Sequence, residues 1–105
     1  MANLMKLMKQ AASVQKDMAR LQEDLAKRTI EFASGGGVVR AVARGDGTLA
    51  QIKIDPSVVN AADVEGLEDM VLAAANGALA EVKQMAAKEM ARLTQGMGLP
   101  DMFGG

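Results

Sequence analysis

The stretch "GGGVVRAVARGDG" (Gly35–Gly47) is an alternating segment between two glycine-rich turns. Within it, Val39, Ala41 and Ala43 fall on one face of an extended chain, as they do in a half-buried strand. The glycines on either side tolerate the positive φ angles that hairpin turns require. The stretch therefore predicts one strand, Val38–Arg44, of an antiparallel sheet, with a turn at each end.

The same stretch contains two fragments that resemble binding motifs. Gly35–Gly37 could wrap a phosphate, but a phosphate-binding loop runs from a strand into a helix and carries Gly-Lys-Ser/Thr. Here Val38-Val39 follows and begins another strand. Arg44-Gly45-Asp46 spells the tripeptide of cell-adhesion ligands, but it lies on a turn and we expect no export of this chain. Both fragments are interpreted as turns only.

The neighbouring segments complete a three-stranded antiparallel meander. The chain from Thr29 to Phe32 alternates between polar and apolar residues, and so does Thr48–Asp55. The apolar residues expected on one face of the latter are Ala50, Ile52 and Ile54. Pro56 then ends the sheet, because proline cannot donate to the ladder.

A long helix is predicted before the sheet, over Asn3–Arg28, with Asn3 as its N-cap. Apolar residues recur in it at alternating intervals of three and four, which is the a/d seam of a heptad repeat. The residues of this seam are Leu4, Leu7, Ala11, Val14, Met18, Leu21 and Leu25. The seam predicts packing against another helix without saying which one.

A second long helix is predicted after the sheet, from Asp63 as N-cap to about Thr94, with Gly96 as its C-terminal stop. Its apolar stripe comprises Val64, Leu67, Val71, Ala74, Ala78, Val82 and Met85. Residues 97–105 carry glycines and a proline, and we expect them to form a flexible tail beyond a single domain of residues 1–96.

The expected fold class is α+β, in the order α-β-β-β-α, with two long helices flanking the meander. At about 1.5 Å per residue both helices outrun strands of six to eight residues, which span roughly 20–27 Å. The overhanging helix ends can be covered only by each other or by another chain. A small sheet with open edges also requires a partner. We therefore expect a homodimer with projecting helical arms.

The composition argues against an enzyme. The chain has no histidine and no cysteine, which removes the usual general base, the usual metal ligand and the best nucleophile. The acidic group Glu65, Glu68 and Asp69 lies in the opening turns of the second helix, where the helix dipole favours acids. We expect no metal, no cofactor and no membrane-spanning segment, and a cytoplasmic location.

Several blocks of the chain resemble the YbaB/EbfC family of bacterial nucleoid-associated proteins. They are "NLMKLMKQA" (Asn3–Ala11), "GGGVVRAVARGDG", "IKIDPSVV" (Ile52–Val59), "EGLEDMVLAAANGALAEV" (Glu65–Val82) and "GMGLP" (Gly96–Pro100). The resemblance spans nearly the whole chain in the right order. It departs from the family at Asn76-Gly77, where an acidic residue commonly follows the Asn. It implies a homodimer with a central sheet and tweezer-like helical arms that binds double-stranded DNA in the nucleoid.

The charges are unevenly distributed, although the net charge is only −1. Residues 1–28 hold six basic and three acidic side chains, whereas residues 55–75 hold five acids and no base. Five of the six cations of the first helix occupy heptad positions c and f, opposite the seam. This basic stripe consists of Lys6, Lys9, Lys16, Arg20 and Lys27. It is either the solvated back of a helix or, as the resemblance favours, a surface that contacts phosphates.

Two other basic groups are secondary candidates for DNA contacts. Lys83, Lys88 and Arg92 lie on the second helix, among acidic residues. Arg40, Arg44 and Lys53 share the sheet face opposite the apolar one, where they could equally form an exposed polar face.

Backbone contacts are expected to dominate DNA binding. Gln10, Gln15 and Gln22 form no recognition-helix pattern, and no aromatic residue is placed to stack on bases. We therefore expect duplex binding with weak sequence selectivity.

The alternative is a protein-interaction module that uses methionine-rich arm tips. Most methionines fall near the start of the first helix, the end of the second and the termini: Met1, Met5, Met8, Met85, Met90, Met97 and Met102. In an antiparallel helix pair these residues would meet at the tips, or would simply fill the pair itself.

Overall fold

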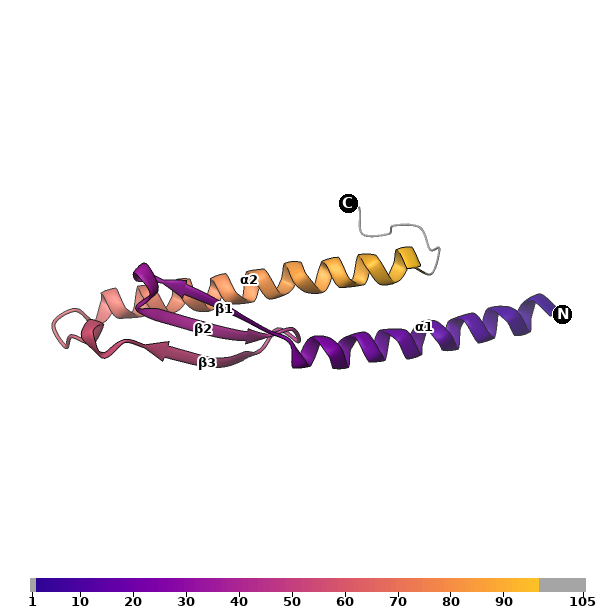
Figure 1. The fold of residues 1–105 in the computed structure, drawn as a ribbon, viewed down its shortest axis with the longest axis horizontal. Helices are drawn as coiled ribbons and strands as arrows, with labels where there is room; N and C mark the ends of the chain where they lie inside the picture. The colour runs from indigo at the N-terminus through magenta and orange to yellow at the C-terminus, as the bar shows by residue number, and fades with distance from the viewer. Residues whose placement is uncertain (1, 97–105) are drawn as a thin grey trace.

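The computed structural model describes residues 2–96, which form two long helices and a three-stranded antiparallel sheet (Figure 1). The elements are α1 (Ala2–Lys27), β1 (Thr29–Ser34), β2 (Val39–Arg44), β3 (Leu49–Ile54) and α2 (Val64–Gly96), with short 3₁₀ turns at Gly35–Gly37 and Pro56–Val58. The order α-β-β-β-α and the α+β class are as predicted. The predicted tail, residues 97–105, lies outside the described residues.

The sheet has the order β1-β2-β3, with β2 in the centre. Phe32 pairs with Ala41 in the first ladder, and Arg40 pairs with Lys53 in the second. The second ladder shifts register between Val42 and Ala43, so Ala43 lies opposite Leu49. The predicted alternation had placed Ala50 with Ile52 and Ile54 on the apolar face. The structure differs from this alternation, because the register shift places Leu49 and not Ala50 opposite Ala43.

Both glycine-rich segments connect strands, as predicted. Gly35, Gly36 and Gly37 have φ values of 60°, 75° and 101°, in the region that side-chain-bearing residues avoid. In the second turn Gly47 has φ 89°, and the Asp46 carboxylate accepts hydrogen bonds from the Thr48 N–H (3.0 Å) and Oγ–H (2.6 Å). These two hydrogen bonds hold the pKa of Asp46 below its ordinary value.

The core lies between α2 and the two strands that it covers, β1 and β2. Its fully buried members are small: Val39, Ala41, Ala43, Ala74, Ala78 and Val82. Small residues on both surfaces let the helix approach the sheet closely. Where Phe32 projects towards α2, the helix carries Gly77, whose missing Cβ leaves room for the ring.

The predicted N-cap of α2 is present. The Asp63 carboxylate accepts a hydrogen bond from the Gly66 N–H at 3.1 Å, which satisfies one of the free donors of the first turn. Close to this cap, the Ser34 hydroxyl at the end of β1 donates to the Met70 carbonyl at 2.6 Å and ties β1 to α2. The start of α2 is therefore fixed both to its own cap and to the sheet.

Helix α1 projects from the sheet as an arm (Figure 1). It begins at Ala2, so Asn3 lies within the helix and the prediction of an Asn3 cap is wrong. The radius of gyration of the chain is 19.7 Å and its longest extent is 73 Å. A compact chain of this length has a radius of gyration of about 13 Å. The predicted overhang of the first helix is therefore present.

The seam of α1 is covered only towards its C-terminal end. Leu25 is buried and Val14, Met18 and Leu21 are half-buried, whereas Leu4 and Leu7 are each 61% exposed and Ala11 is also exposed. Figure 1 shows the reason: α2 runs beside the second half of α1 and ends at Gly96, before the first half begins. The first half of the seam has no partner among the described residues.

The joint between arm and sheet depends on one close approach. The Gly45 N–H donates to the Arg28 carbonyl at 2.9 Å, and Gly45 is buried against the last turn of α1. A Cβ at Gly45 would fall 2.7 Å from the Leu25 carbonyl carbon and closer still to its oxygen. The Arg28 guanidinium also lies 3.3 Å from the Glu89 carboxylate on α2.

Candidate nucleic-acid interface

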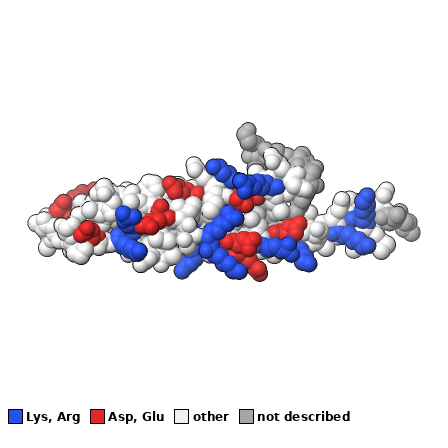
Figure 2. All heavy atoms as spheres, in the orientation of Figure 1, with Lys and Arg blue, Asp and Glu red and all other residues white. Residues whose placement is uncertain are grey.

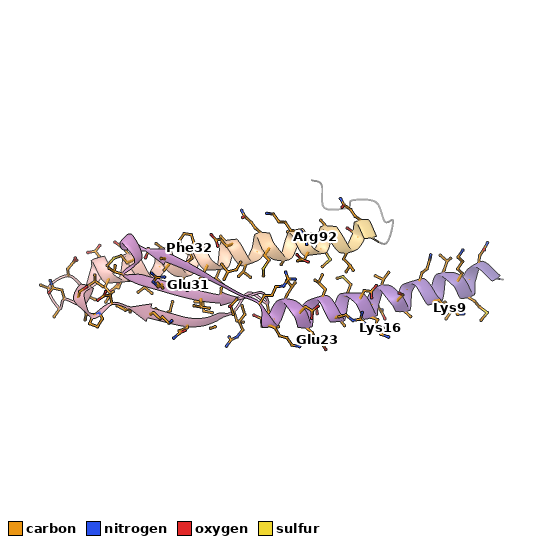
Figure 3. The ribbon with its side chains drawn as sticks, viewed as in Figure 1. Lys9, Lys16, Glu23, Glu31, Phe32 and Arg92 are labelled. Atoms are coloured by element: carbon orange, nitrogen blue, oxygen red, sulfur yellow. The ribbon has the colours of Figure 1, made fainter. Side chains whose placement is uncertain are left out.

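The basic stripe of α1 lies on the exposed side of the arm. The heptad that buries Leu25 turns positions c and f away from α2, and all five members of the stripe are exposed. Figure 3 shows two of them, Lys9 on the projecting half of α1 and Lys16 farther along the helix. The pattern of the seam therefore fixes where these cations point.

No member of the stripe is neutralised by an ion pair within residues 2–96. None of the five has a carboxylate oxygen within 4.0 Å, although Glu23 lies in the same stripe. The ion pairs of the described residues join Arg28 and Arg92 to Glu89 and Arg40 to Glu31. The cations of the stripe can thus contact an external anion without first breaking an internal pair.

The length of the stripe matches a duplex. Lys6 and Lys27 are separated by about 32 Å along the helix axis at 1.5 Å per residue. One turn of B-DNA is about 34 Å long and exposes phosphates along its whole length. A straight arm can therefore follow the backbone of about one turn.

The secondary cations of α2 do not form one surface. Lys83 lines a hollow beside the turn Gly45–Gly47, whereas Lys88 lines a different hollow with Glu81, Glu89 and Arg92. Arg92 is already paired with Glu89 at 3.4 Å. Acidic neighbours thus weaken this group more than they weaken the stripe on α1.

The sheet presents a third basic group on the face away from α2. Arg40 and Lys53 are directly opposite each other in the ladder, and both are exposed together with Arg44. Arg40 forms an ion pair with Glu31 at 3.1 Å across β1 and β2. This arrangement also fits an ordinary solvated sheet face.

The acidic residues Glu65, Glu68 and Asp69 lie at the far end of the molecule from the projecting arm. Figure 2 shows blue side chains along α1, with red ones among them on the half nearest the sheet, and red ones around the start of α2. Within residues 2–96, no group of three His, Cys, Asp or Glu residues is arranged to hold a metal ion. Within the same residues, neither α1 nor α2 contains an apolar stretch long enough to span a membrane.

The methionines that the structure describes do not gather at one tip. Met5 and Met8 are exposed on the projecting half of α1, whereas Met85 and Met90 are half-buried on α2 (Figure 1). Met1, Met97 and Met102 lie outside the described residues. The apolar surface of the arm tip is instead made by Leu4, Met5, Leu7 and Met8, each exposed by more than half.

Sequence reasoning did not find the ion pair between Arg28 and Glu89. Both residues are ordinary surface charges in the sequence, and only the tertiary structure brings them together. It also missed the close contact of Gly45 with the end of α1, because the sequence shows this glycine only as a turn residue.

Comparison with known proteins gives consistent results. The sequence model of the YbaB/EbfC DNA-binding family matches residues 1–97. A nucleoid-associated protein of Thermoanaerobacter pseudethanolicus is 46% identical over 101 residues, covering 96% of this chain and 91% of its own. Another, from Moorella thermoacetica, is 48% identical over 100 residues, covering 95% and 96%. The fold is similar to that of an uncharacterised protein from Helicobacter pylori, with a TM-score of 0.73 at 24% identity, over 80% of this chain and 88% of that one.

Proposed function

Because the chain belongs to the YbaB/EbfC family of nucleoid-associated DNA-binding proteins, we propose that it binds duplex DNA as a homodimer through the basic stripe of α1. The contacts go mainly to phosphates, and sequence selectivity is weak. The family is one of DNA-binding proteins and not of enzymes, which confirms the predicted absence of catalysis. The protein acts at the nucleoid, in the cytoplasm.

One observation carries the proposal. Five exposed cations follow one side of a projecting helix for about one duplex turn, without an ion-pair partner among residues 2–96. The groups on α2 and on the sheet are smaller, and each contains an arginine that is already paired. Unpaired cations contribute more to phosphate binding, because no internal interaction is lost on contact.

Weak selectivity follows from what the stripe lacks. Lysine dominates it, and lysine recognises phosphate as a point charge without reading base edges. Phe32 packs against Gly77 on α2, so it cannot stack on a base. The acidic start of α2 lies away from the arm, so it does not repel a duplex bound along α1.

The homodimer is supported by surface that one chain leaves open. Leu4 and Leu7 are exposed on the arm, and the apolar side of β3 is exposed on the sheet. Two copies would also present two basic stripes, which raises the effective concentration of the second at the duplex.

The test compares two double variants of equal charge. Lys9 and Lys16 changed together to Gln should weaken binding by similar factors on two duplexes of unrelated sequence. The matched control changes Lys53 and Lys88 to Gln, away from the stripe, and should keep most of the affinity. An equal loss in both pairs would mean that the interface is not confined to α1.

A second function has its own observation, the exposed apolar tip formed by Leu4, Met5, Leu7 and Met8. Flexible methionines suit surfaces that adapt to several partners. This candidate is a protein-interaction module. It would be preferred if the wild type bound no duplex even at low salt.

A further inference from the structure

The arm is attached to the sheet over a short length at its root. Among the residues of α1 that the structure describes, only Leu25 is buried, close to the end of the helix at Lys27. Arg28 is the single residue between α1 and β1, and its carbonyl accepts a hydrogen bond from the Gly45 N–H. Contacts so close to the root fix the position of the arm there, but they resist a change of its angle only weakly.

Farther along, partial apolar contacts hold the arm where α2 runs beside it (Figure 1). Val14, Met18 and Leu21 are half-buried, and the seam is exposed from Ala11 to Leu4. Apolar contacts are non-directional, so half-covered side chains can exchange neighbours when the helix changes its angle. An interaction of defined geometry is needed to hold one orientation.

The Glu89 carboxylate on α2 provides such an interaction. It lies 3.3 Å from the guanidinium of Arg28, whose N–H donates to the Leu25 carbonyl at 3.1 Å and so continues the last turn of the arm. The same oxygen, Oε1, lies 3.4 Å from the Arg92 guanidinium, which restricts the carboxylate that Arg28 binds. Among the ion pairs within residues 2–96, the pair of Arg28 and Glu89 is the one that joins the arm to α2.

Partial burial strengthens this pair relative to an ordinary surface pair. The Glu89 side chain is 19% exposed, whereas the Glu31 side chain that pairs with Arg40 on the sheet is 44% exposed. Salt screens partly buried charges much less than exposed ones. A carboxylate that leaves water also needs a partner, so loss of Arg28 from Glu89 is unfavourable.

A small change in the angle of the arm has a large effect at the basic stripe. Lys9 lies about 28 Å from Arg28 along the helix axis, at 1.5 Å per residue. A swing of about 20° at the root would move Lys9 by about 10 Å. This displacement is close to the width of the major groove of DNA, about 12 Å. The angle of the arm therefore decides which phosphates the stripe can reach.

We propose that Glu89 is a positioning residue for DNA binding, which sets the angle of the arm by holding Arg28. The inference rests on the proposed function of the basic stripe and adds what positions it. Without Glu89, the arm keeps its orientation for only part of the time. The apparent dissociation constant for DNA then rises as the inverse of that fraction.

A distance between two spin labels measures the angle without DNA. The chain has no cysteine, so Ala12→Cys on the arm and Gln51→Cys on β3 supply two exposed labelling sites. Excess unlabelled chain ensures that the distances measured lie within one copy. Glu89→Gln should widen the distance distribution by at least about 4 Å, which corresponds to a swing of about 10° at Ala12.

Glu81→Gln is the matched control for this measurement. It removes the same charge from an exposed residue of α2 that has no ion-pair partner within residues 2–96, so the distribution should stay as in the wild type. A Glu89→Gln distribution as narrow as that of the wild type would overturn the inference.

Charge exchange distinguishes the ion pair from a general effect on α2. Arg28→Glu and Glu89→Arg should each widen the distribution, because like charges then face each other at the root of the arm. The chain with both changes restores an attractive pair and should recover the narrow distribution. Circular dichroism checks that each variant keeps its helices. A double variant as wide as the single ones would show that this pair does not set the angle.

Duplex affinity gives a readout of opposite sign to simple electrostatics. Removing an acid should strengthen DNA binding through long-range charge. Loss of the positioning contact should instead weaken it, by about 2- to 5-fold for one arm and up to about 25-fold if both arms of the homodimer must be in place. Glu81→Gln should bind at least as tightly as the wild type.

The outcomes separate this inference from the proposed function. An affinity of Glu89→Gln equal to or higher than that of the wild type would refute the positioning role alone. No duplex binding by the wild type at low salt would refute the proposed function, and the label distances would still decide what holds the arm.

Discussion

Replacing Gly45 by alanine should loosen the joint between α1 and the sheet. The new Cβ would fall 2.7 Å from the Leu25 carbonyl carbon, and the contact is with backbone, which cannot turn aside as a long side chain can. Overpacking of this kind costs about 1–3 kcal/mol. Separating the two segments also stretches the hydrogen bond from the Gly45 N–H to the Arg28 carbonyl, worth about 1 kcal/mol.

The free energy of unfolding should therefore fall by about 2–4 kcal/mol. In a domain of this size the thermal midpoint would drop by on the order of 10–20 °C. Urea unfolding at a fixed protein concentration measures the first quantity, and a thermal scan followed by circular dichroism measures the second. A Gly45→Ala variant within about 0.5 kcal/mol of the wild type would show that the joint does not depend on this approach.

Substitutions at Gly47, two residues away, distinguish the effect of a steric contact from the effect of backbone strain. It has φ 89° and nothing near its Cβ position, so alanine there should be destabilising only through the left-handed backbone. Asparagine tolerates that conformation better, so Gly47→Asn should be milder than Gly47→Ala. At Gly45 the order should reverse, because asparagine is larger than alanine and the difficulty there is space.

Two further predictions concern α2 and the second turn. Gly77→Ala should lower the free energy of unfolding by up to about 2 kcal/mol despite the better helix propensity of alanine, because the new Cβ would meet the Phe32 ring. Urea unfolding measures this loss, which should be smaller when Gly77→Ala is made in a Phe32→Leu background. The pKa of Asp46 is lowered first by the Thr48 hydroxyl, so its contribution to stability is present above the unfolded value and is lost as the pH falls below 3.8. Asp46→Asn should remove this part of the acid dependence, and thermal midpoints from pH 5 to pH 2 that run parallel for both proteins would contradict it.

Periodicity predicted the elements of this chain well because each element has one apolar face. The alternation of Val39, Ala41 and Ala43 marked β2 correctly, and all three are fully buried. The three-and-four spacing of the α1 seam predicted a helix with its cations on the side away from the seam. These are local properties, and the sequence contains them.

The errors arose where a pattern depends on distant residues. The bulge that places Leu49 and not Ala50 opposite Ala43 occurs without any marker such as glycine or proline. The seam shows that Leu4 and Leu7 are apolar, but not that α2 ends before it reaches them. The contact between Gly45 and Leu25 joins residues that only the fold brings together.

The candidate site was predictable in part for the same reason. Heptad positions place Lys9 and Lys16 on the exposed side of α1, and the structure has both exposed. Their lack of ion pairs, and the pairing of Arg40 and Arg92 with acids, could not be read from spacing. These pairings are what separate the stripe from the other basic groups.

The salt dependence of duplex binding tests the central proposal most directly. Each phosphate neutralised releases condensed counterions, so log affinity should fall against log salt with a slope of about −0.9 per contact. Changing Lys9 and Lys16 together to Gln should reduce the slope by about two units for one arm, and by about twice that if both arms of a dimer bind. The thermal midpoint should stay within a few degrees, because both side chains point away from the seam. An unchanged slope in the double variant would place the DNA contacts elsewhere and contradict the account.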